Sequence, residues 1–281
     1  MPTFSSSIKQ EICNKKYDIE SIKMILSSFL TNKMKISLSH FKIENHVDSN
    51  FSFIITFITE CIDKIAKIES HLSYSEINNF NKNRIYQLTI DQAKFEQVIN
   101  DLKVLDDKEI KFCKTESQKK AYVIGEFLSG GSISDISKSL YHLEIRSTNP
   151  KFLHIVQEIL ISWKLSPILL NRKYNNVLYL KCATEVSDFL KHIGDIDNMS
   201  LLEDTIISRD FNNQLHRLNN LDMSKISKSK KASNLQIEMI KVILKSQIYK
   251  QQKDKFKNFC LWRLNHPTAS ITELSNLYQK M

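Results

Sequence analysis

Four lysines in one short polar stretch are the residues whose type and spacing most clearly suggest a chemistry, the binding of phosphate. They are Lys225, Lys228, Lys230 and Lys231. No acidic residue lies between Asp222 and Glu238 to offset them, so the stretch can attract a polyanion such as a nucleic-acid backbone. A soluble tether between two domains would have the same composition, and both interpretations stay open.

Other basic residues could extend such a surface. Lys241 and Lys245 lie four residues apart, on one face of a predicted helix; a solvated helix face is the alternative. Arg146, Arg172 and Lys173 fall on predicted strands. If that sheet face meets DNA these three side chains contact phosphates, and ordinary surface placement is the alternative.

The net positive charge is concentrated in the last third of the chain. The net charge is +9, and residues 201–281 hold 14 basic and 7 acidic residues. Residues 1–114 and 115–200 each carry a net charge of only +1. This pattern predicts a polyanion-binding module carried by a nearly neutral scaffold, although a lysine-rich solvated surface would also explain it.

Composition and motifs exclude several classes of protein. With 42% hydrophobic and 25% charged residues, the 281-residue chain is expected to form two or three globular domains. It has no apolar run long enough for a membrane helix and no secretory signal, and its five scattered cysteines fit free thiols. Metal-ligand spacings and nucleotide-binding or nucleophile motifs are absent. We therefore expect a cytoplasmic protein that uses no metal or cofactor.

The elements that must position these residues are predicted to repeat. Both halves of residues 1–195 have the order helix, two strands, helix, two strands, helix, which predicts an α+β fold of two pseudo-symmetric copies. In the first copy the predicted helices start at Asp18, at Ser49 or Asn50 and at Asp91, and the strands are 34–38, 41–47, 71–77 and 84–90. In the second copy the predicted helices are 119–129, 149–160 and 185–193, and the strands are 132–134, 141–147, 168–173 and 177–182.

Small residues four positions apart mark one helix in each copy. Three of the four glycines lie within residues 125–131, and an offset of 98 residues aligns this segment with the first helix. Gly125 and Ser129 then match Ser27 and Thr31. Such spacing lets two helices approach closely, although an ordinary core contact has the same pattern.

This arrangement resembles the LAGLIDADG homing-endonuclease fold, in which two such helices pack at the centre of a saddle whose sheets face DNA. The resemblance implies an acidic, metal-binding residue at the end of each helix in active nucleases. In this chain the corresponding positions are Asn32 and Gly130, which have no carboxylate. Glu126 and Asp135 lie nearby, but neither has an acidic counterpart in the first copy. The chain is therefore expected not to be a nuclease.

A degenerate saddle followed by a basic helical segment resembles the WhiA-type bacterial DNA-binding regulators, most closely over residues 120–281. The matching phrases are Phe127 to Ser132, Tyr141 to Ile145, Ser187 to Leu190 with Ile193-Gly194, Arg217-Leu218 with Asn220, Lys228, Ala232, Gln236, His266-Pro267 and Glu273-Leu274. The resemblance implies DNA binding, a role in transcription, cell division and chromosome segregation, and a C-terminal helix-turn-helix. Arg217, Ser270 and Thr272 join the lysines above as expected DNA contacts.

The predicted domains follow these boundaries. Residues 1–110 and 116–197 form the two repeats, residues 198–250 form connecting helices with a basic linker, and residues 251–281 form a helix-turn-helix-like segment. In detail, a helix opens at the capping box of Ser200 to Glu203, the linker is 222–233, and further helices are 235–249, 255–264 and one opened by Ser270 to Glu273. A recognition helix would need further residues, so this last segment is expected to be truncated.

Two functions of different class remain. The first is a monomeric, non-enzymatic regulator that binds double-stranded DNA at the nucleoid. The alternative is an endonuclease, or an RNA-binding maturase, that uses residues outside the motif. A scaffold that has lost DNA binding and acts through protein partners is a third interpretation.

Overall fold

The computed structural model describes residues 3–39, 42–66, 71–76, 84–91, 113–136, 141–171 and 175–279. Contacts divide the chain into two compact units, residues 1–206 and 207–281. Within the described residues no helix combines the length and the apolar character that crossing a bilayer requires.

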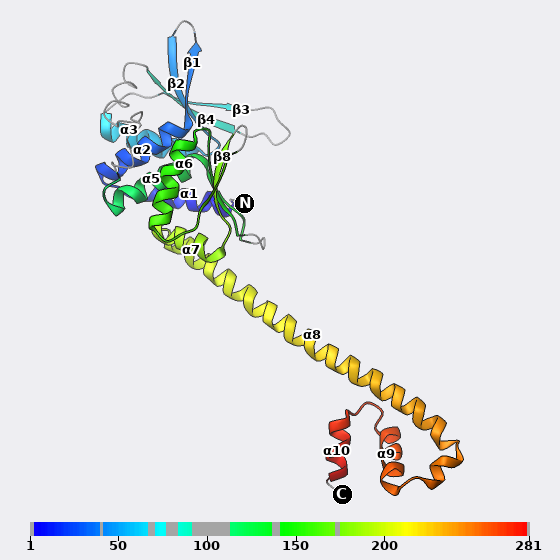
Figure 1. Cartoon of the computed structure of the whole chain (residues 1–281). Helices are drawn as coiled ribbons and strands as arrows, with labels where there is room; N and C mark the ends of the chain where they lie inside the picture. Colours follow the sequence, from blue (N-terminus) through cyan, green and yellow to red (C-terminus); the bar gives the residue numbers. More distant parts are fainter. Residues whose placement is uncertain are drawn as a thin grey trace. The chain divides into compact units, whose positions relative to one another are not determined.

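The first unit contains the two predicted copies, and each builds a four-stranded antiparallel sheet (Figure 1). The strand orders are β1-β2-β4-β3 and β5-β6-β8-β7, so the second copy repeats the topology of the first. The first copy comprises α2 (Ile19–Lys33), β1 (Met34–Ser39), β2 (Lys42–Ser49), α3 (Ser52–Ala66), β3 (His71–Glu76) and β4 (Arg84–Asp91). The second comprises α5 (Glu116–Gly130), β5 (Gly131–Ile133), β6 (Leu143–Ser147), α6 (Pro150–Ser162), β7 (Ile168–Asn171), β8 (Asn176–Leu180) and α7 (Ala183–Ile193). The prediction of a repeated α+β unit is confirmed, and the helix expected after Asp91 lies outside the described residues.

Capping side chains set where these helices begin. The Asp18 carboxylate accepts a hydrogen bond from the Ser21 amide (3.1 Å) at the start of α2. Asn149 accepts from the amide of Lys151 (3.0 Å) at the start of α6, where Pro150 occupies the first helical position as predicted.

An N-terminal helix that the sequence analysis did not identify precedes the first copy. This helix, α1 (Phe4–Asn14), is capped by Thr3 and buries Phe4, Ile8 and Ile12. These apolar residues are spaced four apart, which is a helical pattern. The residues between them are polar (three serines, Lys9, Gln10 and Glu11), so the average hydropathy of the segment does not indicate a buried helix.

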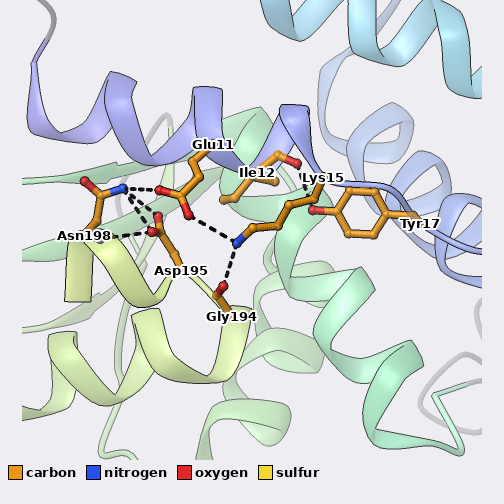
Figure 2. Close-up of polar contacts among 7 residues, drawn as sticks. All are labelled: Glu11, Ile12, Lys15, Tyr17, Gly194, Asp195 and Asn198. Carbon is orange, nitrogen blue, oxygen red and sulfur yellow. Dashed lines mark hydrogen bonds and ion pairs between the residues drawn. The ribbon is translucent and has the colours of Figure 1, made fainter. Parts of the chain in front are cut away.

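Polar contacts tie α1 to the end of α7, as Figure 2 shows. Gly194 ends α7 with φ +76°, and its carbonyl accepts a hydrogen bond from Lys15 Nζ (2.6 Å). The Asn198 amide group donates to Glu11 (2.9 Å) and to both carboxylate oxygens of Asp195 (3.0 Å each). Glu11 and Asp195 therefore share one donor group in a part-buried site.

The long helix α8 (Ile196–Leu244) corrects three expectations about the last third of the chain. The helix does not begin at the capping box of Ser200 to Glu203, since Asp195 already accepts from the Asn198 amide (3.2 Å) one turn earlier. The expected linker 222–233 is helical, because residues 196–244 contain no glycine or proline to break the helix. The helix expected over 235–249 ends at Leu244.

Three short elements follow in the second unit. They are the 3-10 turn η2 (Gln247–Gln251), α9 (Asp254–Asn265) and α10 (Ile271–Gln279). The helices α9 and α10 agree with the two predicted at 255–264 and after Ser270.

Candidate functional site

The helices α2 and α5 pack against each other at Gly125, where the missing side chain lets the two backbones come close. A Cβ atom at Gly125 would lie 1.9 Å from Ser28 Oγ and 2.4 Å from the carbonyl oxygen of Ile25. Any side chain there must displace α2. The predicted close approach of the two helices is confirmed, and the small residue that faces Gly125 is Ser28.

Asn32 joins the two helices at their C-terminal ends. Its amide nitrogen donates to Glu126 Oε2 (3.0 Å), to Ser129 Oγ (2.7 Å) and to the carbonyl oxygen of Arg146 (3.1 Å). The Ser129 hydroxyl in turn donates to the Glu126 carbonyl (2.8 Å). Asn32, at one motif position, therefore acts as a hydrogen-bond donor to the second copy.

Glu126 is a fully buried acid inside this contact. Its side chain is fully buried, and burial raises its pKa to about 8, although the hydrogen bond from Asn32 acts in the opposite direction. Its Oε1 atom has no hydrogen-bond partner in the described part of the chain. A fully buried carboxyl group with a raised pKa is a poor ligand for a solvent-borne metal ion, so Glu126 does not fit the role of the missing motif acids.

The other motif position has no room for a carboxylate. A Cβ atom at Gly130 would lie 2.1 Å from the Arg146 carbonyl oxygen and 3.2 Å from Asn32 Nδ2. Among the described residues, no group of three or more histidine, cysteine, aspartate or glutamate side chains could hold a metal ion. These residues do not fit the divalent metals that the LAGLIDADG resemblance implies for active nucleases.

A basic hollow of about 470 Å³ opens beside Asn32 and Gly130. Four cationic side chains line it and come from both copies and from α1. They are Lys9, Lys33, Lys35 and Arg146. The predicted contact Arg146 therefore lies in the hollow, where its exposed side chain also pairs with Glu144.

Sequence reasoning missed the three lysines of this hollow. Lys33 directly follows the motif residue Asn32 and Lys35 lies two residues further on, and this proximity in sequence was an available signal. Lys9 could be found only after α1 had been recognised. The other predicted saddle contacts, Arg172 and Lys173, lie outside the described residues.

The predicted lysines of the second unit form an exposed basic stretch along α8. Lys225, Lys228, Lys230 and Lys231 are all solvent-exposed, as are Arg217, Lys241 and Lys245. Lys245 lies in the turn that follows the end of α8 at Leu244, so it does not share a helix face with Lys241 as predicted. Lys225 lies 3.9 Å from Asp222, and the other three lysines of the cluster make no ion pair with any described residue. Because the stretch is helical, their Cα positions are fixed relative to one another, which differs from the flexible linker that we expected.

The C-terminal half of α8 packs on α9 and on the turn before α10. The Arg263 guanidinium is buried and donates to Ser233 Oγ (3.3 Å) and to the Ala269 carbonyl. The predicted capping box is present, since Ser270 Oγ accepts from the Glu273 amide (3.2 Å) and Glu273 accepts from the Ser270 amide (2.6 Å). Thr272 is exposed in the first turn of α10.

Comparison with protein families gives two matches. Residues 119–212 match the WhiA LAGLIDADG-like domain, and residues 215–281 match the WhiA C-terminal HTH domain. Together they cover more than half of the chain.

Relatives and solved structures agree with this assignment. A protein of Staphylococcus aureus (strain JH9) named "Probable cell division protein WhiA" is 28% identical over 98% of this chain and 89% of its own length. Full-length DUF199/WhiA from Thermatoga maritima has a similar fold, with a TM-score of 0.64 and 18% identity over 99% of this chain and 92% of that one. The N-terminal LAGLIDADG domain of DUF199/WhiA has a TM-score of 0.56 and 19% identity, over 71% of this chain and 97% of that one.

Proposed function

The chain belongs to the WhiA family, and from this premise we propose that it is a non-enzymatic DNA-binding protein that regulates transcription in cell division and chromosome segregation. The observation that carries the proposal is the cluster of exposed lysines on α8, within the segment that matches the helix-turn-helix model. Lysines that contact phosphates release counterions from duplex DNA, and this release drives binding.

Each part of the second unit has a role in this proposal. The lysines from Lys225 to Lys245 neutralise phosphates of double-stranded DNA. Arg217, which precedes these lysines in the sequence, and Ser270 and Thr272, which follow them, add further DNA contacts. The buried Arg263 positions the turn before α10 through its hydrogen bonds. The protein acts as a monomer on chromosomal DNA in the cytoplasm, because the two copies of the first unit already satisfy each other's interface.

The main alternative, an endonuclease, has no suitable acids at the centre of the saddle. Asn32 donates hydrogen bonds, Gly130 cannot accept a side chain without movement, and Glu126 is fully buried with a raised pKa. We expect no cleavage of supercoiled or genomic DNA by the full chain with Mg²⁺ or Mn²⁺. Cleavage that co-purifies with the monomer and disappears on Glu126→Gln would contradict the non-enzymatic assignment.

The DNA-binding proposal is tested by replacing Lys225, Lys228, Lys230 and Lys231 together with alanine. The logarithm of the affinity for duplex DNA should fall linearly with the logarithm of the salt concentration. The variant should reduce this slope by up to about one unit for each phosphate that is no longer neutralised. Since phosphate contacts carry no sequence information, a genomic fragment and a random duplex should be affected alike.

A charge-matched control separates a local surface from a general effect of net charge. It replaces four exposed lysines of the first unit, Lys16, Lys114, Lys181 and Lys191, with alanine. We expect this control to keep the wild-type slope. An unchanged slope in the α8 variant would place DNA binding on the saddle, and tighter binding of structured RNA than of duplex DNA would favour the maturase alternative.

A further inference from the structure

Lys9 is a buried lysine that no described acidic side chain pairs with. Its side chain extends from α1 to α5, where Nζ donates to the Leu128 carbonyl (3.3 Å) and lies 5.5 Å from the centre of the Phe127 ring. It makes no ion pair with any described residue, although the residue is only 7% exposed. Burial and the nearby Lys33 lower its pKa to about 8, which still leaves it protonated at neutral pH. A buried ammonium group is costly unless an anion offsets it.

Lys9 lines the hollow beside Asn32, together with a second cation that forms no ion pair with a described residue. This cation is Lys33, the half-buried last residue of α2. Burial and the adjacent Lys35 lower its pKa, and the carboxylate of Asp48 acts in the opposite direction. The other two cations are already paired, Lys35 with Asp48 (2.5 Å) and Arg146 with Glu144. Lys9 and Lys33 are therefore the two cations of the hollow that form no ion pair with a described residue and that could act on a ligand there.

The polar groups of the hollow select for an anion. No acidic side chain is among the described residues that line it, but Asp48 lines an adjoining hollow that shares Lys9, Lys33 and Lys35 with it. Glu126 behind it is fully buried, and burial raises its pKa. The C-terminal ends of α2 and α5 point a partial negative charge toward this region, which opposes an anion. That partial charge is smaller than the two full charges of Lys9 and Lys33. Hydroxyl groups of Ser147 and Thr148 also line the hollow, and its volume suits a small ligand.

We propose that this hollow binds a phosphate group, with the ammonium groups of Lys9 and Lys33 neutralising it. The phosphate is either a phosphodiester of the DNA backbone or a free phosphorylated small molecule. The site goes beyond the proposed function, which places the DNA contacts on the second unit and gives the hollow no ligand.

Inorganic phosphate is the probe that tests the site. It is titrated into the full chain at constant ionic strength, with chloride as the reference salt, and both Tm and the heat of binding are measured. Wild-type protein should show saturable binding and a rise in Tm. Lys9→Met, which keeps the apolar stem, should weaken binding at least tenfold. The control Lys23→Met, on α2 and paired only with Glu20 (3.2 Å), should bind as the wild type does.

A second variant and a second readout keep the test independent of stability. Lys33→Met removes a half-buried charge at the edge of the hollow and should also weaken phosphate binding, even if Lys9→Met fails to fold. Phosphate should raise the pKa of Lys9, followed by NMR of isotope-labelled lysine side chains, and a purely structural lysine would not respond. Wild-type protein without saturable phosphate binding, or equal binding by wild type and both variants, would overturn the proposal.

DNA titrations with the same variants identify the source of the phosphate. If the hollow holds a backbone phosphate, Lys9→Met should also reduce the salt slope for duplex DNA by about one unit. If it holds a free phosphorylated molecule, DNA binding should stay unchanged while phosphate binding disappears. The α8 lysine variant should keep its phosphate binding in either case, so failure of this site and failure of the DNA-binding proposal are distinguishable.

Discussion

The hollow of the first unit and the exposed face of α8 both depend on lysine, but they use it in opposite ways. In the hollow, Lys9 and Lys33 are partly or fully buried, and their positions follow from the packing of α1, α2 and α5. Along α8, lysines such as Lys228 and Lys231 are exposed and make no ion pair with a described residue. Anion binding in the hollow should therefore depend on the exact positions of its lysines, whereas anion binding along α8 should depend on the number of positive charges.

This difference determines how each surface should respond to substitution. A buried group acts through close contacts, so one change at the helix contact alters the whole site. Exposed charges are screened and act nearly independently, so their individual effects should be small and additive. The following predictions test this contrast.

The largest effect is expected from Gly125→Leu at the contact of α2 and α5. A Cβ atom there already overlaps Ser28 Oγ and the Ile25 carbonyl oxygen, so a leucine must separate the helices. We expect a decrease of about 3 kcal/mol in the free energy of unfolding. Urea unfolding, followed by Trp163 fluorescence in a Trp262→Phe background, measures it.

The matched control is Ala232→Leu on the exposed side of α8. A surface residue of this kind should change stability by less than about 0.5 kcal/mol. If Gly125→Leu unfolds at the same urea concentration as the wild type, α2 and α5 are not packed as described. The claim that the site in the first unit depends on close helix packing would then be wrong.

A smaller effect, which depends on pH, is expected at Asp195. Burial and the neighbouring Glu11 raise its pKa to about 6, against an ordinary value of 3.8. The folded state then binds the proton more tightly than the unfolded state, so the stability present below about pH 4 is lost as pH rises through 6. We expect this group to contribute a loss of about 2 kcal/mol between pH 4 and 7.

Asp195→Asn removes the titrating group and keeps an acceptor for the Asn198 amide. The difference in unfolding free energy between this variant and the wild type should therefore grow in favour of the variant as pH rises. Asp197→Asn, an exposed position in the first turn of α8, should show no such trend. A difference that stays constant with pH would mean that Asp195 is not shifted by burial.

The sequence predicted the elements of the first unit well, because their signals are local. Apolar periodicity and caps such as Asn149 with Pro150 located the helices, and alternation located strands such as β6. The repeat then implied the topology of both sheets. The prediction was wrong at residues 222–233, where the polar, lysine-rich composition indicated a linker. This segment contains no glycine or proline, and it continues the helix α8.

The hollow could not be predicted in the same way, because it depends on contacts between distant segments. Lys9 meets the Leu128 carbonyl across 119 residues, and Asn32 meets Glu126 across 94. No spacing in the sequence encodes such a contact. The lysine cluster of α8, in contrast, was predicted from the sequence alone and is exposed in the structure, since an exposed cluster needs no tertiary partner. Its role in DNA binding stays a prediction.

The smallest effect is expected from Lys228→Ala on α8. Lys228 is exposed and unpaired among the described residues, so its removal should leave stability unchanged. Removing one phosphate contact should lower the salt slope by about one unit and weaken DNA binding only a few-fold, equally on genomic and random duplexes. Lys231→Ala should do the same, and the double variant should equal the sum of the two in the logarithm of affinity. A decrease of more than tenfold from Lys228→Ala, confined to one DNA sequence, would mean that this lysine makes a fixed contact. DNA binding by α8 would then depend on the exact position of a lysine, as phosphate binding in the hollow does. The proposed difference between the two surfaces would be wrong.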